Sequence, residues 1–204
     1  MSLAGSAKPV AANRAASAKA RPGVRRARPP RRQGPWRAPA IDIVVASPLW
    51  RAKRGARALL RRAIRVAAAM AGACGELAVL LVDDRAIRAL NRNWRGKDKA
   101  TNVLAFPAPS RLPASPMTPR PGAPIRPLGD VVIAFETVRR EADAAQVPFD
   151  HHLAHLAVHG FLHLVGYDHA AAAQAEAMEA LEVAILSRLD VPDPYATPAA
   201  EPDR

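Results

Sequence analysis

The hydrophobic and polar positions of this chain follow two spacings, one typical of strands and one typical of helices. Four short runs are rich in β-branched and large aliphatic residues, and turn-forming or polar residues separate them from their surroundings. These runs are residues 41–46 (IDIVVA), 76–82 (ELAVLLV), 101–106 (TNVLAF) and 129–135 (GDVVIAF). The pattern predicts a small mixed sheet of about four strands.

Helical spacing fills the stretches between these strands and follows the last of them. Residues that favour a helix start precede several stretches: Ser47 with Pro48, Asp83 or Asp84, and Asp150. The expected helices cover about 48–67, 84–94, 136–145, 150–165 and 170–189. The last helix has an inward face made of Met178, Leu181, Ile185 and Leu189. The fold class is therefore α/β (α+β), with helices packed on the sheet around a central helix that carries histidines.

Three segments fall outside these patterns, so we expect the folded domain to span residues 41–195. Residues 1–40 contain six prolines and no periodic apolar positions. They are expected to form a disordered Arg/Pro-rich extension, because they cannot bury enough surface to offset their ordering entropy. Residues 107–127 hold eight prolines and no acidic residue, and we expect a flexible loop there. Residues 196–204 should form a frayed tail.

The net charge of +12 comes mainly from the N-terminal extension. Residues 1–40 hold ten of the thirty Lys and Arg residues and no Asp or Glu, so residues 41–204 carry only +2. An Arg-rich segment of this kind can bind RNA phosphates, or it can serve as an organelle transit peptide. It can also be a solvated extension with no function of its own. All three interpretations remain open.

The rest of the composition is typical of a soluble protein in a reducing compartment. The single Cys74 cannot form an internal disulfide. No apolar run reaches the roughly 20 residues that a membrane span needs. We therefore expect a cytoplasmic location and no membrane partner, with organelle targeting by residues 1–40 left open.

A second group of basic residues lies in the helical stretch after Pro48. Its members on the side opposite the apolar stripe are Arg54, Arg57, Arg61 and Arg65, and no acidic residue occurs between positions 51 and 65. A solvated helix face usually mixes both signs of charge, so a face of one sign favours contact with a polyanion such as RNA. Simple solubility is the competing interpretation. Lys97 and Lys99, in the loop at residues 95–100, are further candidates for RNA contacts.

The candidate chemistry lies in residues 156–169 (LAVHGFLHLVGYDH). On a helix His159 and His163 lie one turn apart, about 40° from each other around the axis, so they can share a metal ion. Gly166 can adopt the left-handed conformation that ends a helix, which lets His169 return to the same ion. Three neutral imidazoles leave a fourth zinc position open for water, as in catalytic sites.

The other histidines extend the same ladder, so spacing alone does not select the ligand pair. His155 with His159 would also satisfy the helical geometry, and only the placement of Gly166 favours the triad. For His155 we expect a packing role or a role in orienting a ligand. His151 and His152 are expected to be ordinary core or surface residues.

The spacing HxxxHxxGxxxH is close to the metzincin peptidase pattern, HExxHxxGxxH. Those enzymes carry a glutamate directly after the first histidine as general base, and this chain has Gly160 there. The sequence therefore contains the metal ligands of such a peptidase but lacks its general base.

Four segments together resemble the YbeY endoribonucleases, over roughly residues 41–195. They are HGFLHLVGYDH (159–169), LNRNWRGKDKATNVLAF (90–106), GDVVIAF (129–135) and EAMEALEVAIL (176–186). The chain departs from the family pattern at Ala105, where a serine is more usual. It also departs in the longer proline-rich loop and in the basic extension of residues 1–40.

The resemblance implies a compact α/β fold and a single-strand-directed endoribonuclease that acts in rRNA processing. It implies roles in ribosome quality control and in maturation of the 16S rRNA 3′ end, with single-stranded RNA and the small ribosomal subunit as partners. The family's zinc ligands fall on His159, His163 and His169, with one Zn2+ per chain and no small-molecule cofactor. A functional arginine of the family falls on Arg95.

These expectations combine into metal-assisted RNA cleavage, in which Arg95 stabilises the negative charge that develops on the phosphorane. Asp168 would orient a ligand or cap the last helix. No general base is visible, and either a metal-bound hydroxide or the substrate's own 2′-hydroxyl can attack. Two alternatives remain: a non-catalytic zinc-containing factor that binds RNA during ribosome assembly, and the disfavoured metallopeptidase.

Overall fold

The four strand-like runs pair into one mixed sheet in the order β1-β2-β4-β3. The computed structural model describes residues 38–109 and 125–196. The parallel strands are β1 (Ala40–Val45), β2 (Glu76–Val82) and β4 (Pro127–Ala134). The remaining strand, β3 (Val103–Pro107), pairs antiparallel with β4 and forms one edge of the sheet. The predicted mixed sheet of four strands is confirmed.

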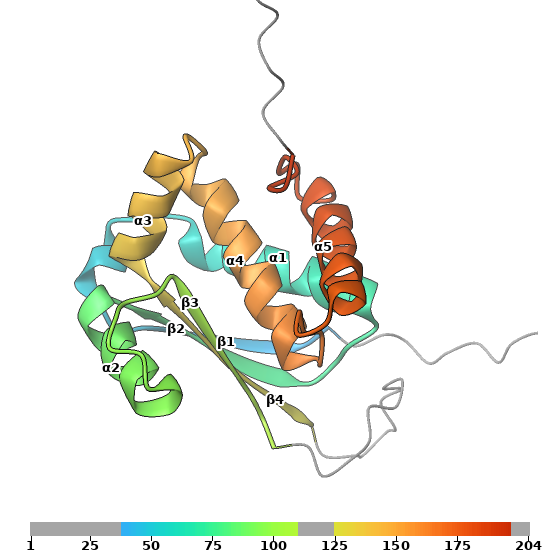
Figure 1. The fold of residues 1–204 in the computed structure, drawn as a ribbon, viewed down its shortest axis with the longest axis horizontal. Helices are drawn as coiled ribbons and strands as arrows, with labels where there is room; N and C mark the ends of the chain where they lie inside the picture. Colours follow the sequence, from blue (N-terminus) through green and yellow to red (C-terminus); the bar gives the residue numbers. More distant parts are fainter. Residues whose placement is uncertain (1–37, 110–124, 197–204) are drawn as a thin grey trace, which may run out of the picture. The chain divides into compact units, whose positions relative to one another are not determined.

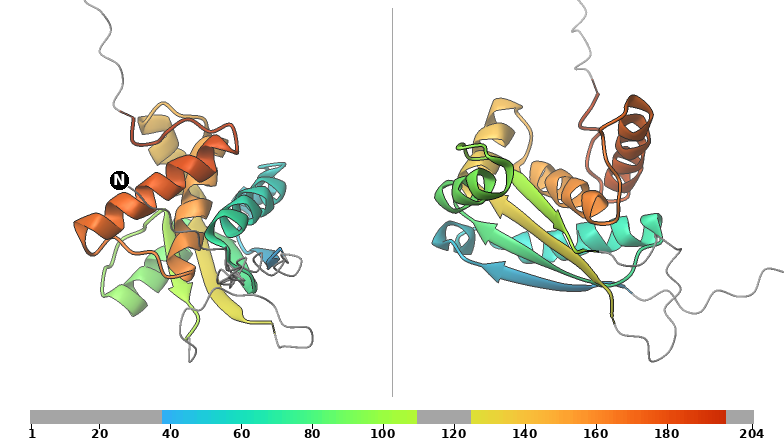
Figure 2. Two further views of the ribbon diagram at one scale, coloured as in Figure 1. Left: turned by 90° about the vertical axis from the view of Figure 1, so that its right-hand side faces the viewer. Right: turned by 60° about the horizontal axis from the view of Figure 1, so that its bottom comes forward.

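Two helices cover one face of this sheet. α1 (Ala56–Ala71) connects β1 to β2, and α4 (Phe149–Leu164) packs on α1, β3 and β4 (Figure 1). α5 (Ala172–Ser187) packs on α4 and α1, farther from the sheet (Figure 2). α2 (Asp84–Arg95) lies against the opposite face, and α3 (Phe135–Ala144) follows β4. The helix that carries the histidines is therefore central, as predicted.

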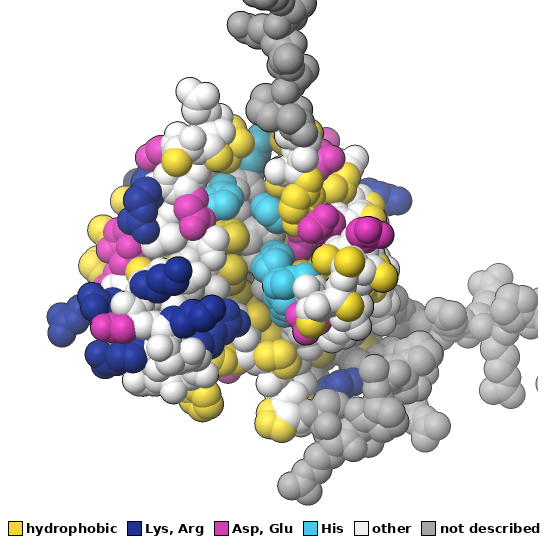
Figure 3. Space-filling model, in the orientation of Figure 1, with side chains coloured by type: hydrophobic (Ala, Val, Ile, Leu, Met, Phe, Trp, Pro, Cys, Tyr) yellow, Lys and Arg dark blue, Asp and Glu magenta, His cyan; other side chains and the backbone are white. Residues whose placement is uncertain are grey.

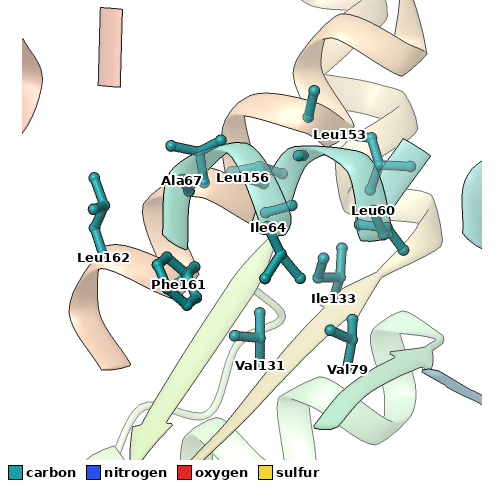
Figure 4. Packing of buried hydrophobic residues seen from close by; sticks show 14 of the residues in the cluster. Leu60, Ile64, Ala67, Val79, Val131, Ile133, Leu153, Leu156, Phe161 and Leu162 are labelled. Atoms are coloured by element: carbon teal, nitrogen blue, oxygen red, sulfur yellow. The ribbon is translucent and has the colours of Figure 1, made fainter. Parts of the chain in front are cut away.

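The main core lies between α1, α4 and the inner face of the sheet. Most of its fully buried side chains come from α1, β2, β4 and α4, and Figure 4 shows Leu60, Ile64, Val79, Val131, Ile133, Leu153 and Phe161. Burying one such side chain contributes roughly 1.5–3 kcal/mol. This layer fixes α4 against the sheet, which gives the residues on its last turns a rigid support.

The helix that we predicted after Ser47 is two helices. A short 3-10 helix, η1, spans Pro48–Arg51, with the Ser47 side chain accepting from the Leu49 amide, and α1 begins only at Ala56. Gly55 separates them with φ 90°, a conformation that the right-handed helix cannot continue through. The Trp50 side chain is buried, and its indole nitrogen donates to the Val82 carbonyl at 2.8 Å. This long-range contact, which spacing does not reveal, fixes the break.

The predicted cap at Asp150 is also wrong. α4 begins at Phe149 with Pro148 as its N-cap residue, and Asp150 lies in the first turn. The Asp150 carboxylate contacts the Lys53 ammonium at 2.9 Å instead of a backbone amide of its own helix. For α2, the sequence left both Asp83 and Asp84 as candidate N-cap residues. The structure selects Asp83, whose side chain accepts from the Ala86 amide at 2.8 Å.

The predicted segments at residues 1–40, 107–127 and 196–204 lie mostly outside the described residues. The described ends of the loop are Pro107, the last residue of β3, and Pro127, the first residue of β4. The loop therefore joins two antiparallel neighbours in the sheet. No helix within residues 38–109 and 125–196 has the length and apolar character needed to cross a membrane.

Candidate metal centre

The last turns of α4 and the segment after it bring three imidazoles together. The Nε2 atoms of His159 and His163 are 3.2 Å apart. Ring nitrogens of His159, His163 and His169 all lie within 4.8 Å of one another. Two ligands bound at 2.0–2.1 Å to a tetrahedral zinc ion are about 3.3 Å apart. The facing nitrogens of His159 and His163 therefore have the separation of two ligands to one ion.

The turn after α4 returns His169 to the cluster. The helix ends at Leu164, and Gly166 has φ 99°, as the sequence predicted for this glycine. The Gly166 amide donates to the His163 carbonyl at 3.2 Å. Asp168 then accepts from the His169 amide at 2.8 Å. Asp168 thus holds the backbone of His169, and it does not cap α5, whose N-cap residue is Ala171.

A buried carboxylate supports the cluster from behind. Glu182 on α5 is fully buried, and its Oε1 atom is 2.8 Å from Nδ1 of His159. Its Oε2 atom accepts from the Tyr195 hydroxyl and lies 3.3 Å from Nε2 of His155. With the His159 proton on Nδ1, the lone pair of Nε2 faces the other two histidines. Glu182 therefore holds His159 in the tautomer and orientation that a metal ligand needs.

The charge states follow from burial and from these hydrogen bonds. Burial alone would raise the pKa of Glu182, but the hydrogen bonds from His155, His159 and Tyr195 outweigh it and lower the pKa to about 2. Burial, together with the neighbouring His159 and His169, lowers the pKa of His163. An ionised Glu182 behind His159, together with a neutral His163, favours a cation in this place.

The cluster opens into a pocket of about 580 Å³ that Arg95 also lines. Arg95 is the last residue of α2, and the other walls are β3 and the end of α4. Asp168 is the only carboxylate among the described lining residues, which are Arg95, Thr101, Asn102, Val103, Ala105, Pro107, His159, Gly160, His163, Gly166, Tyr167, Asp168 and His169. The fold thus joins Arg95 to three histidines more than 60 positions later in the chain.

Figure 3 shows this face of the molecule. Histidine side chains form a file down its middle, and Lys and Arg side chains gather to one side of the file, over α2. The site therefore combines metal-ligating nitrogens with a neighbouring positive surface. That combination suits a substrate that carries negative charge beside the atom that reacts.

The other candidate residues lie at different distances from the cluster. His155 contacts Glu182 on the buried side of His159, which fits its expected supporting role. Lys97 and Lys99 are exposed on the loop after α2 and do not line the pocket. Arg54, Arg57, Arg61 and Arg65 line a separate groove on α1. His152 pairs with Glu141 at 2.9 Å, an ordinary structural contact.

Gly160 leaves no room for the general base of a metzincin. It is buried, and a Cβ atom at this position would lie 2.9 Å from Cγ1 of Val131 and 3.3 Å from Cγ2 of Val103. A side chain at this position would therefore start toward the sheet, although the backbone of Gly160 also lines the pocket. A glutamate at this point of α4 would be driven into the core.

Glu182 and Tyr195 were not predicted as site residues. A signal for Glu182 was present in the sequence, because it is four residues after Met178 and three before Ile185, both on the inward face of α5. A carboxylate on an apolar face needs a buried partner. Tyr195 has no comparable signal, since it follows the last helix in a segment rich in Pro and Asp.

The family model described as Endoribonuclease YbeY matches residues 49–190. A protein named Endoribonuclease YbeY from Rhodopseudomonas palustris (strain BisA53) is 55% identical over 161 residues, covering 78% of this chain and 91% of that protein. A protein of the same name from Nitrobacter winogradskyi is 54% identical over 163 residues, covering 78% and 84%.

Among solved structures, the solution structure of TM1509 from Thermotoga maritima matches at 21% identity with a TM-score of 0.41. That match covers 79% of this chain and 99% of the other. The residues that the family model matches include β2, β4, β3, the three-histidine cluster and Arg95. By these matches the chain belongs to the YbeY family.

Proposed function

We propose that this protein is a metal-dependent endoribonuclease that cuts single-stranded RNA at the pocket where Arg95 meets the three histidines. The main observation behind this proposal is that three imidazole nitrogens within 4.8 Å of one another share an open pocket with an arginine. Membership of a family whose relatives are named Endoribonuclease YbeY supports RNA as the substrate. A guanidinium beside a cation site suits phosphodiester chemistry, because both groups meet phosphoryl oxygens.

We propose zinc as the metal, one ion per chain, with His159, His163 and His169 as its ligands. An all-imidazole donor set suits zinc better than magnesium or calcium, which prefer oxygen ligands. The 3.2 Å between the facing nitrogens and the hydrogen bond from His159 to Glu182 both support this assignment. When bound there, zinc would supply a Lewis acid that acidifies water and polarises a phosphoryl oxygen.

The protein groups have separable roles. Arg95 offers a planar fork that binds two phosphate oxygens and stabilises the charge that builds on them as the bond breaks. Glu182 keeps the proton of His159 on Nδ1, so that this histidine does not turn away from the pocket. Ala105 presents only a methyl group to the pocket, so β3 supplies no hydroxyl at this point. The attacking oxygen belongs to water or to the substrate's 2′-hydroxyl.

The proposed substrate is ribosomal RNA in the cytoplasm, with action at the 16S rRNA 3′ end on the small ribosomal subunit. The family resemblance supports this role, and the surface charge is compatible with it. The candidate RNA contacts outside the pocket are Lys97, Lys99, Arg54, Arg57, Arg61 and Arg65. All six are basic residues at the surface or in a groove that opens to it.

The test combines metal analysis with an RNA cleavage assay on purified wild type, His163→Ala and Arg95→Glu. Arg188→Glu, an exposed charge reversal at the end of α5, is the matched control. We expect about one zinc per chain and cleavage for wild type and control. His163→Ala should lose both, whereas Arg95→Glu should keep the metal and lose about 100-fold or more in rate. Equal cleavage by all four proteins would identify a contaminating nuclease and reject the proposal.

A non-catalytic RNA-binding factor in ribosome assembly is the second candidate, because the basic groove on α1 lies apart from the histidines. This role predicts RNA binding that falls steeply with salt and persists in Arg95→Glu. It also predicts no metal-dependent turnover in wild type. The same set of variants therefore separates the two functions.

A further inference from the structure

The indole of Trp94 is unusually exposed for its size. Its exposed fraction is 72%, the highest of any large hydrophobic side chain among the described residues. Its ring contacts Phe106 edge-on, with 5.9 Å between the ring centroids. One edge of the indole is therefore supported while most of its surface faces solvent. Tryptophan is enriched at binding interfaces, because its large ring buries much apolar area against a partner.

Trp94 lies next to the candidate active site. It precedes Arg95 in the last turn of α2, and Arg95 lines the histidine pocket. Along β3, Ala105 and Pro107 line the same pocket, whereas the intervening Phe106 points to the opposite side of the strand, toward α2. Since β3 is the edge strand, only this strand separates Trp94 from the pocket.

The surroundings of the indole are positively charged. Arg92, Arg95, Lys97 and Lys99 lie within five positions of Trp94, and none of the four forms an ion pair with a described residue. Arg88 is different, because Asp98 binds it at 2.8 Å. Figure 3 shows Lys and Arg side chains gathered over α2 beside the file of histidines. An exposed aromatic face among unpaired cations is the usual design of a site for single-stranded nucleic acid.

We propose that Trp94 is a stacking platform for one base of a single-stranded RNA whose neighbouring phosphate lies at Arg95. This inference rests on the proposed function and adds a subsite to it. The indole stacks on the face of the base, and the surrounding cations contact the backbone on either side. Every base has such a face, so the subsite tolerates any sequence but requires an unpaired nucleotide. A duplex keeps its bases stacked inside, and the platform therefore selects single strands.

The first test measures the affinity of the full chain for a fluorescent single-stranded RNA of about 12 nucleotides by anisotropy. Trp94→Ala should weaken binding about 5- to 100-fold, and Trp94→Phe, which keeps an aromatic face, should lose less. Leu49→Ala is the matched control, because Leu49 is an exposed apolar side chain on η1, 39% accessible and remote in sequence. Binding by Trp94→Ala within twofold of wild type overturns the proposal.

The second test identifies the partner of the indole. A set of RNAs is prepared in which an abasic site replaces one base at a time. For wild type, the loss of affinity should concentrate at one position. For Trp94→Ala, removing the base at that position should cost nothing further, since the stacking partner is already absent. If abasic sites weaken both proteins equally, the indole does not contact a base. It is then better explained as a docking point for a protein.

The salt dependence and the cleavage assay provide independent readouts. Stacking involves no ion release, so the ratio of wild-type to Trp94→Ala affinity should stay constant as salt rises. A ratio that falls with salt contradicts the proposal. Binding that depends on Trp94 without any cleavage would reject the nuclease function and keep the platform. If neither cleavage nor binding changes in Trp94→Ala, the stacking platform is rejected and the nuclease function is kept.

Discussion

Glu182 is the residue on which the geometry of the histidine cluster depends most. A carboxylate with 0% exposure is costly unless its oxygens are satisfied, and here it contacts His159, His155 and Tyr195. These contacts join α5 and the segment after it to the metal-facing histidine on α4. The orientation of His159 is therefore set from a different helix and from the end of the described chain.

The variant Glu182→Gln tests this dependence. The amide has one acceptor oxygen instead of two, so a partner that donates to the other position meets an N–H group instead of an acceptor, and the charge that favours a cation is lost. We expect zinc affinity to fall about 10- to 100-fold and the free energy of unfolding to fall by about 1–3 kcal/mol. Competition with a chromophoric chelator and thermal unfolding measure the two effects. Glu179→Gln, exposed on the same helix, is the control. Unchanged affinity in Glu182→Gln would contradict the assigned role.

At the level of elements, α2 and α3 cap each other. The first amide of α2, at Asp84, donates to the Glu136 carboxylate on α3 at 2.9 Å. The Asp84 carboxylate in turn accepts from the Thr137 amide at 3.0 Å and the Thr137 hydroxyl at 2.7 Å. α3 has no side-chain cap from its own N-cap residue, and Asp84, on the neighbouring helix α2, serves as its cap instead. This exchange holds the start of the helix that carries Trp94 and Arg95.

Asp84→Ala should therefore destabilise the protein more than the removal of an ordinary surface charge would. The substitution leaves the Thr137 amide and hydroxyl without their acceptor, and we expect a loss of about 1–3 kcal/mol in unfolding free energy. Urea denaturation measures it. The control is Asp143→Ala on α3, whose only ion pair among the described residues is with Arg139 at 3.8 Å, and which should change stability by less than about 0.5 kcal/mol. Equal effects of the two substitutions would show that the reciprocal caps contribute nothing.

The packing of α4 on the sheet accounts for the glycine that replaces the metzincin glutamate. Gly160→Glu restores that pattern, but its Cβ would lie 2.9 Å from a stiff valine and its carboxylate would enter the core without a partner. We expect a loss of at least about 3 kcal/mol in stability and no gain of peptidase activity. Gly160→Ala is the graded comparison, and it should lose less because it adds only the Cβ. A stable Gly160→Glu protein that hydrolyses casein would reject this account.

At the level of the whole molecule, the sequence predicted what local periodicity encodes. The four strands and the turn at Gly166 follow from spacing within a few residues. The separation of η1 from α1 could not be predicted from spacing, because it depends on the hydrogen bond from Trp50 to a carbonyl 32 positions away. The contact of Glu182 with His159 spans 23 positions, and only the fold creates it. Arg95 was identified through resemblance alone, since no spacing rule connects it to the histidines.

The basic groove on α1 belongs to this scale, because it lies over the opposite edge of the sheet from the histidines. It has a volume of about 970 Å³ and is lined by η1, α1, the turn between them, Val45 of β1 and Leu81 of β2, whereas the histidine pocket is lined by β3. Three strand spacings separate these edges, about 14 Å. Among the seven basic lining residues, Lys53 and Arg62 pair with Asp150 and Asp190. The other five have no ion pair with a described residue: Arg51, Arg54, Arg57, Arg61 and Arg65.

If the groove holds RNA, it does so through phosphates, since its aromatic residue Trp50 is only 3% exposed and cannot stack on a base. The double variant Arg57→Gln/Arg61→Gln should then weaken RNA of any sequence alike. It should also reduce the slope of log affinity against log salt by up to about 1.4, since each lost phosphate contact on a single strand contributes about 0.7. A salt series by anisotropy measures the slope. Arg139→Gln/Arg188→Gln removes the same charge outside the groove and should leave the slope nearly unchanged. Equal slopes for the two double variants would mean that the α1 face serves solubility, and RNA recognition would then rest on the pocket and the surface of α2.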